Sequence, residues 1–219
     1  MEEGGEPLRL REKAYASFTR HLLARDVRPG QFVSQRELVA LTGLPLGAIR
    51  ELVPRLEAEG LLSTIPQRGI QIAHIDLSLI KDAFQFRLFL EKEAIALFTV
   101  SASDGLLAKL RHEHEDMLAR GLSEELAPEM VEQAQAIDWN LHDTIIDSTS
   151  NEIIAKAYRV NSIKMRLINQ ERFRIDGRVV PVMREHLAIL AAIESREPQK
   201  AVDAIAEHIN NARALALKV

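Results

Sequence analysis

Apolar and polar positions follow two different periods within the first 75 residues. Three segments place apolar residues every three or four positions, the spacing of one helical face: residues 9–25, 34–43 and 46–60. In the second segment, Ser34 and Glu37 have capping-box spacing, and Gly43 is a typical helix stop. Residues 61–65 and 70–75 alternate instead, which predicts a β-hairpin. Three helices and a hairpin, with a tight turn between the last two helices, predict a winged helix-turn-helix.

From residue 77 onward the pattern is helical almost throughout. Six segments, separated by short Gly-, Ser- or Pro-containing breaks, are expected as helices: 77–99, 104–120, 127–148, 151–173, 179–195 and 198–217. Short links favour an antiparallel six-helix bundle, whose interior is a common place for ligand and metal sites. The expected fold is therefore mainly α, with a winged helix-turn-helix domain at 1–76 and an all-α bundle at 77–219.

The composition is that of an ordinary globular protein, with 47% hydrophobic and 27% charged residues in 219. No apolar run reaches the roughly 18 residues of a membrane helix, and the acidic start MEEGGEPLRL is unlike a signal peptide. We therefore expect a cytoplasmic protein without a membrane partner. Cysteine is absent, so a metal site would have to use histidine and carboxylate. No phosphate loop, nucleophile elbow or zinc-protease motif points to catalysis.

The net charge of −4 is divided unevenly along the chain. Residues 9–75 carry ten Lys or Arg against six Asp or Glu, and nine of the ten cations are arginine. Residues 77–219 carry eighteen against twenty-two. Because arginine favours bidentate contacts to phosphates and guanine edges, the basic first part is compatible with DNA binding.

The motifs of this part resemble the DNA-binding module of GntR-type bacterial transcription regulators. The similarity covers about 65 residues and rests on "PGQ", "RELVALTG", "IRE", "RLEAEGLL" and "P-x-RG". It implies that Arg36 and Arg50 read bases or phosphates, while Ser34 and Gln35 clamp the DNA backbone. Arg68 and Gly69 become the tip of the wing.

Two features depart from the family pattern. Pro45-Leu46 stand where the family has a Ser-Arg or Thr-Arg pair at the start of the reading helix. Pro54 lies inside that helix, where proline removes a backbone hydrogen bond.

Four ionisable residues of the predicted bundle fall on apolar stripes. Asp138 and His142 share a helix face with Ile137 and Leu141, and His186 and His208 lie among apolar residues of the last two helices. A single inward histidine is commonly just hydrogen-bonded, but each further buried polar group adds a desolvation penalty. A divalent cation would satisfy all four together. Spacing alone leaves both readings open, and it gives the other histidines (His21, His74, His112 and His114) surface or boundary positions.

The same region resembles the FCD effector domain of the FadR branch of the GntR family. The similarity covers 77–219 and rests on "R-x-x-L-E" at Arg87, "D-x-x-x-H" before "SN", "EH-x-x-I-x-A-I" and a final "EH". Six helices favour its VanR-like subgroup. The resemblance implies a metal held by four residues: Asp138, His142, His186 and His208. Zinc is the first expectation, with nickel, manganese or iron as alternatives.

A small organic acid is the effector that this resemblance implies, reaching the metal through its carboxylate. Arg87 and Arg166 are the expected cationic contacts, with Asn161 or Asn140 as polar neighbours. The alternative for Arg87 is a weak surface pair with Glu91 at i,i+4.

Taken together, these patterns predict a homodimeric, ligand-responsive regulator, and a repressor rather than an activator. Two winged helices would read a palindromic operator in double-stranded DNA. Two rivals remain: a metal sensor, in which the cation is itself the effector, and a metal-dependent enzyme. The enzyme would need a general base beside the metal, for which the sequence offers no clear candidate.

Overall fold

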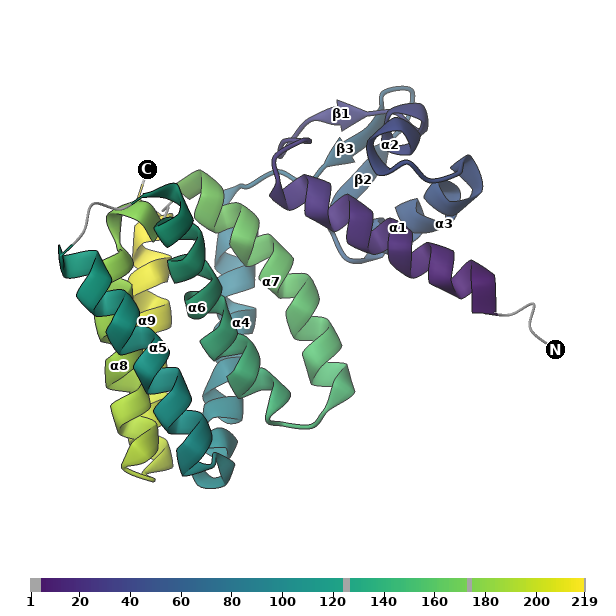
Figure 1. The fold of residues 1–219 in the computed structure, drawn as a ribbon. Helices are drawn as coiled ribbons and strands as arrows, with labels where there is room; N and C mark the ends of the chain where they lie inside the picture. The colour runs from purple at the N-terminus through teal and green to yellow at the C-terminus, as the bar shows by residue number, and fades with distance from the viewer. Residues whose placement is uncertain (1–4, 124–126, 173–174, 219) are drawn as a thin grey trace. The chain divides into compact units, whose positions relative to one another are not determined.

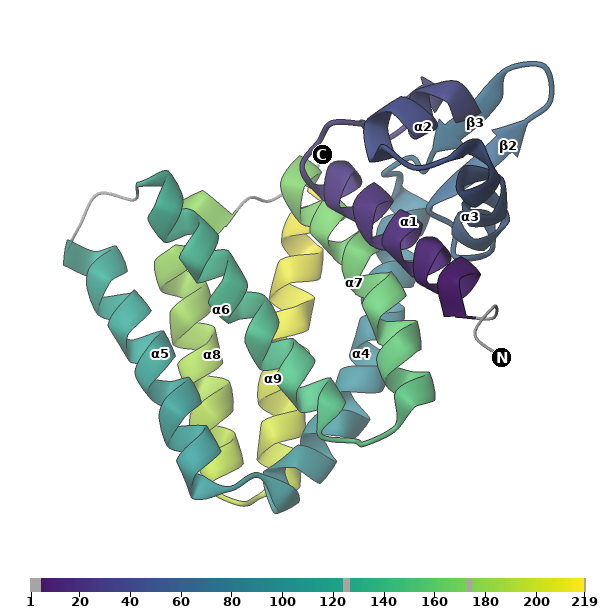
Figure 2. The same ribbon diagram turned by 45° about the vertical axis from the view of Figure 1, so that its right-hand side comes forward.

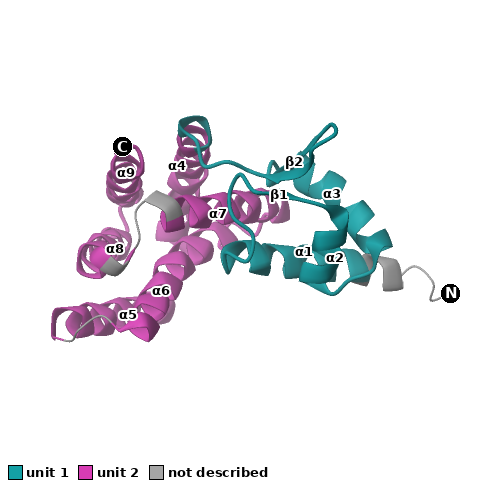
Figure 3. Ribbon diagram, turned by 90° about the horizontal axis from the view of Figure 1, so that it is seen from above, with its two compact units in different colours: residues 1–79 teal, residues 80–219 magenta. Residues whose placement is uncertain are grey.

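The computed structural model describes residues 5–123, 127–172 and 175–218 of the chain. The predicted ranges 1–76, 77–219 and 151–173 extend to residues 1–4, 173–174 and 219, which lie outside the described residues. The chain divides into two compact units, Met1–Leu79 and Ile80–Val219 (Figure 3). The described elements are mainly helical, as predicted.

The first unit contains three helices and a small sheet (Figure 1). Its elements, in chain order, are α1 Gly5–Leu23, β1 Phe32–Val33, α2 Gln35–Thr42, α3 Leu46–Ala58, β2 Leu62–Ile65 and β3 Gly69–Ile72. The three helices and the β2–β3 hairpin confirm the predicted elements. The strand β1 was not predicted; it pairs antiparallel with β3, which gives the sheet order β1-β3-β2.

Local chemistry sets the boundaries of α2. The Ser34 side chain accepts from the Glu37 backbone N–H, while the Glu37 carboxylate accepts from the Ser34 N–H, as the capping-box spacing predicted. Gly43 ends the helix in the left-handed region at φ 70°, which glycine adopts without steric penalty. The next helix, α3, follows Pro45, which supplies no side-chain cap, and runs through Pro54.

The second unit contains six α-helices within the described residues, joined by short links (Figure 2). They are α4 Leu77–Ser101, whose first residues belong to the first unit, α5 Asp104–Ser123, α6 Pro128–Asp147, α7 Glu152–Arg172, α8 Val179–Glu194 and α9 Pro198–Ala216. All six confirm predicted segments, with ends shifted by up to three residues. A short 3-10 helix, Ile175–Gly177, lies at the break predicted between α7 and α8.

Apolar stripes orient the helices of this unit. Leu141 and Ile145 of α6 are fully buried, and so are Ile189 of α8 and Ile205 of α9. Since residues three and four apart share a helix face, burying these positions also turns their polar neighbours on the same stripes inward. None of the helices among the described residues is both long and apolar enough to cross a membrane.

Candidate metal and effector centre

Four side chains from three helices converge in the interior of the second unit. Asp138 and His142 of α6, His186 of α8 and His208 of α9 each place one ligand atom within 4.8 Å of the others. The three imidazoles are 0–4% exposed. His186 Nε2 lies 3.4 Å from both Asp138 Oδ1 and His208 Nε2. The structure therefore brings together all four residues that the sequence placed on inward stripes.

The contacts of His142 assign its tautomer. Its Nε2 lies 2.6 Å from Arg87 Nη2, and its Nδ1 lies 2.7 Å from Glu91 Oε2. A guanidinium can only donate, so Nε2 accepts. The proton of a neutral ring is therefore on Nδ1, which donates to the Glu91 carboxylate.

Glu91 is a fully buried carboxylate with three hydrogen-bond donors around it. Besides His142, it accepts from Arg87 Nε at 2.6 Å and from the Tyr158 hydroxyl at 2.7 Å. Burial alone would raise the pKa of Glu91, but the neighbouring Arg87 and His142 hold that pKa far below its ordinary value. The Arg87–Glu91 pair is thus present at i,i+4, but it is buried and not the surface pair that the sequence allowed as an alternative.

His208 is oriented by a second carboxylate. Its Nδ1 lies 2.7 Å from Glu185 Oε2, and Glu185 also accepts from Asn211 at 3.1 Å. Because a carboxylate is an acceptor, the proton of a neutral His208 is on Nδ1, and its Nε2 carries the lone pair. This arrangement, a carboxylate behind a histidine, is the usual outer support of a metal-binding imidazole.

His186 is oriented by a fourth histidine, His114 of α5. His114 Nδ1 lies 2.7 Å from the Leu110 carbonyl oxygen and must donate to it, so its Nε2 accepts from His186 Nδ1 at 3.1 Å. The prediction that His114 is a surface or boundary residue was wrong, because this residue is 0% exposed. A stripe argument would have found it: His114 falls between Leu107, Leu110 and Met117 on the buried face of α5.

These contacts leave three Nε2 lone pairs and one carboxylate facing one another. No neutral group among the four offers a proton to the shared space, so the lone pairs repel until a cation lies between them. Burial, followed by the neighbouring histidines, lowers the pKa of His186 well below its ordinary value. Burial likewise lowers the pKa of His208. Both rings are therefore neutral near pH 7, the state in which imidazole binds a metal, and the donor set fits a divalent cation.

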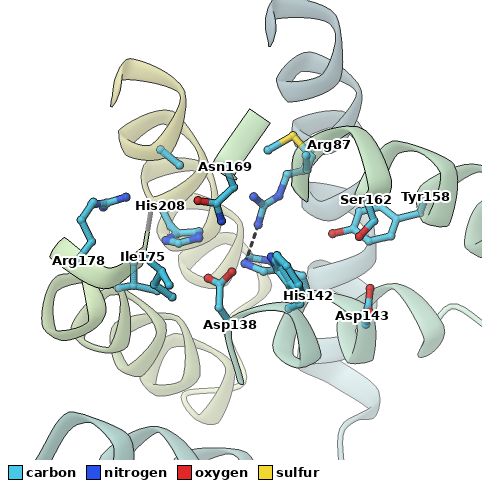
Figure 4. Close-up of a pocket in the computed structure, with 14 residues that line it drawn as sticks. Arg87, Asp138, His142, Asp143, Tyr158, Ser162, Asn169, Ile175, Arg178 and His208 are labelled. Carbon is cyan, nitrogen blue, oxygen red and sulfur yellow. Dashed lines mark hydrogen bonds between the residues drawn. The ribbon is translucent and has the colours of Figure 1, made fainter. Parts of the chain in front are cut away.

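A pocket of about 630 Å³ opens beside these side chains (Figure 4). Arg87, Asp138, His142 and His208 all line it. The remaining wall combines polar and apolar side chains: Trp139, Asp143, Tyr158, Ser162, Met165, Asn169, Ile175, Arg178, Val182 and Ala212. The candidate metal ligands therefore form part of the wall of a cavity that can hold a small molecule.

Of the four predicted effector contacts, only Arg87 lines this pocket. Asn161 is buried, and its amide donates to the Ala83 carbonyl of α4 at 3.0 Å. Arg166 stacks over the Trp139 ring, 3.9 Å from its centroid. Asn140 is exposed, two positions beyond Asp138 and thus on another face of α6. The structure instead brings Ser162, Asn169 and Arg178 to the pocket, none of which lies in a motif that the sequence singled out.

The residues predicted to contact DNA lie in the first unit and are all exposed. Ser34 caps α2, and Gln35 and Arg36 form its first turn. Arg50 projects from α3. Arg68 and Gly69 lie at the tip of the β2–β3 hairpin, where the Arg68 guanidinium stacks 4.3 Å from the centroid of the Phe32 ring.

Comparison with known proteins agrees with this helical centre. The family model of the FCD domain matches residues 82–211. The Nta operon transcriptional regulator of Aminobacter aminovorans is 27% identical over 186 residues, 83% of this chain and 82% of the relative. A solved structure from Rhodococcus sp. RHA1, described as a transcriptional regulator GntR, has a TM-score of 0.75 at 16% identity, covering 95% and 97% of the two chains. The zinc-bound FCD domain of TM0439 has a TM-score of 0.53 at 21% identity, covering 66% of this chain and 96% of that one.

The fold and the pocket thus define a helical effector-domain protein, and the chain belongs to the FCD domain family. Within it, the chain is a GntR-family transcriptional regulator. Its relatives and structural neighbours are regulators and not enzymes, which excludes the predicted enzymatic alternative.

Proposed function

We propose that the second unit binds a divalent cation through Asp138, His142, His186 and His208. The observation that carries this proposal is the common orientation of the three imidazoles: each directs Nε2 inward while its Nδ1 is held from outside. Imidazole nitrogen with one carboxylate suits zinc, and also nickel, manganese or iron. The zinc-bound FCD domain among the structural neighbours supports zinc as the first candidate. A bound cation supplies a Lewis-acid position for a carboxylate oxygen.

The effector is a small organic acid that binds in the pocket beside the cation. Arg87 and Arg178 provide positive charge in the pocket wall, and Ser162 and Asn169 provide neutral hydrogen-bonding groups. Guanidinium groups favour carboxylates because they can form two parallel hydrogen bonds. An acid with a second polar group would therefore find partners on more than one side of the cavity.

The first unit is a winged helix-turn-helix that reads DNA. The helix order, the sheet order β1-β3-β2 and the exposed arginines support this assignment. In this proposal α3 enters the major groove with Arg50, Arg36 contacts bases or phosphates, and Ser34 and Gln35 clamp the backbone at the start of α2. Arg68 and Gly69 form the wing tip.

A homodimer of such chains would bind a palindromic operator, because two-fold symmetry in the protein requires two matching half-sites. We assign the role of repressor, in which the acid shifts the population between arrangements that differ in operator affinity. The acid can shift it only by its difference in affinity for the two arrangements.

Operator binding by an Arg50→Ala variant tests the DNA-binding assignment. An operator is first selected from random duplexes with the purified protein, and affinities are then compared by fluorescence anisotropy at one fixed salt concentration. The variant should bind about 1–3 kcal/mol more weakly. Lys109→Ala, which removes an exposed cation from α5, is the control and should bind like wild type. Unchanged affinity of the Arg50 variant would mean that α3 is not the reading helix.

Separate titrations of metal and acid distinguish a ligand-responsive regulator from a metal sensor. The purified protein is stripped of metal, loaded with zinc and challenged with a panel of organic acids while bound to its operator. Release that requires an acid supports the proposal. Release or capture of DNA by the metal alone, with no further effect of any acid, would identify a metal sensor.

A further inference from the structure

Arg87 is bound to an atom that the proposed cation also needs. Its Nη2 lies 2.6 Å from His142 Nε2, and the guanidinium must be the donor. His142 Nδ1 is already engaged with Glu91, so Nε2 carries the one ring lone pair that faces the pocket. The lone pair that would bind a metal is therefore occupied by an internal cation (Figure 4).

One lone pair cannot serve both partners. A metal–imidazole bond is about 2.0–2.1 Å long for zinc and lies along the same direction as the hydrogen bond from Arg87. Arg87 is also held in place from behind, because its Nε donates to Glu91 Oε1 at 2.6 Å. The competing group is thus fixed by a buried ion pair, with its side chain 11% exposed.

We propose that Arg87 is an internal competitor for the cation site, which blocks His142 until a metal displaces its guanidinium. This inference rests on the proposed function, since it presupposes that a cation binds the four converging residues. Displacement breaks the hydrogen bond to His142 but not the Nε contact with Glu91. It leaves N–H donors of Arg87 available to an anion in the pocket that this residue lines. Metal binding would thereby prepare the pocket for an acid, and by linkage the acid would strengthen metal binding by the same factor.

Zinc affinity of Arg87 variants of the full chain tests this inference. Affinities are measured by competition with a chromophoric chelator. Arg87→Lys keeps the positive charge and the partner of Glu91, but it lacks the second arm that reaches His142. Arg87→Met removes both charge and donors. Because hydrogen bonds to charged groups are among the stronger ones, both variants should bind zinc roughly tenfold more tightly than wild type.

Arg178→Met is the matched control. It removes one positive charge from the same pocket wall, but Arg178 has its ion-pair contact with Glu185, 3.7 Å away, and not with a proposed metal ligand. Its zinc affinity should change less than threefold. An equal gain in the Arg178 variant would reduce the effect to general charge repulsion and overturn the inference.

The lysine variant carries the test if the methionine variant fails to fold, because it retains a cation beside the buried Glu91. Lysine-variant affinity equal to or weaker than wild type, with wild type binding zinc, would refute the competition while leaving the cation centre intact. Wild-type protein that binds no zinc would refute the cation centre and the inference together.

Discussion

Replacing His114 with leucine should weaken metal binding although this residue is not a proposed ligand. The substitution conserves an approximately similar volume but removes the acceptor that lies 3.1 Å from His186 Nδ1. His186 is 0% exposed, so no bulk water replaces that acceptor. The ring can then move its proton to Nε2, which lies 3.4 Å from Asp138 Oδ1 and can donate to it. That tautomer has no lone pair directed at the cation.

The size of the effect follows from this competition between tautomers. A buried donor left without an acceptor costs about 1–3 kcal/mol, and the Nε2–H tautomer avoids part of that penalty. A metal must reverse the change before it binds. Loss of such outer partners typically lowers metal affinity by about 10- to 100-fold, or about 1.4–2.8 kcal/mol.

Chelator competition with zinc and the visible absorption of the cobalt-substituted protein provide two independent measurements. His114→Gln is the informative companion, because its amide oxygen can reach the position of the missing acceptor. It should retain most of the affinity and a nearly unchanged cobalt spectrum, whereas the leucine variant should change both. His112→Leu, an exposed position on the same helix, controls for the loss of a histidine from α5.

Equal zinc affinity and an identical cobalt spectrum for wild type and His114→Leu would refute this reasoning. Equal losses in the glutamine and leucine variants would also count against it, since packing and not the acceptor would then explain the change. Urea unfolding of the metal-free proteins separates a loss of fold from a loss of metal binding.

Two other substitutions test the surroundings of the same centre. His208→Ala should reduce bound metal by elemental analysis, and added zinc should no longer raise its Tm; full metal content would remove His208 from the ligand set. Wild type should gain about 2.7 kcal/mol of stability at a free zinc concentration of 100 Kd. Glu91→Gln should lower the free energy of unfolding by about 3–5 kcal/mol, because Arg87 and His142 lose a buried anionic partner. A urea midpoint like that of wild type would show that Glu91 is not the group that balances their charge.

The fold could be predicted where a segment was long enough to repeat its own period. Over 20 residues, the α6 segment shows its apolar stripe several times, and the observed helix, Pro128–Asp147, differs from the prediction by one residue at each end. The strand β1 has two residues, Phe32 and Val33, which is too short to show alternation. Its pairing of Val33 with Ile70 is tertiary and has no signature in the local sequence.

The candidate site shows the same division between local and distant information. Stripes revealed which polar residues point inward, because that depends on one helix alone. They could not reveal which groups meet there. Arg178 precedes α8, and Asn169 and Ser162 belong to α7, so their common pocket depends on how the helices pack. Asn161 shows the converse, because its inward amide is used by the Ala83 carbonyl and not by a ligand.

Arg87 and Glu91 show why spacing alone does not determine the energy of an interaction. At i,i+4 on an exposed helix face, such a pair contributes about 0.2–0.5 kcal/mol. Here Tyr158 and His142, from two other helices, surround the same pair, and Glu91 is fully buried. Removing one partner of a buried pair costs several times more, because the other charge remains without water. The identical spacing therefore describes a minor surface contact or a central element of the site, and only the packing of α6 and α7 against α4 decides between them.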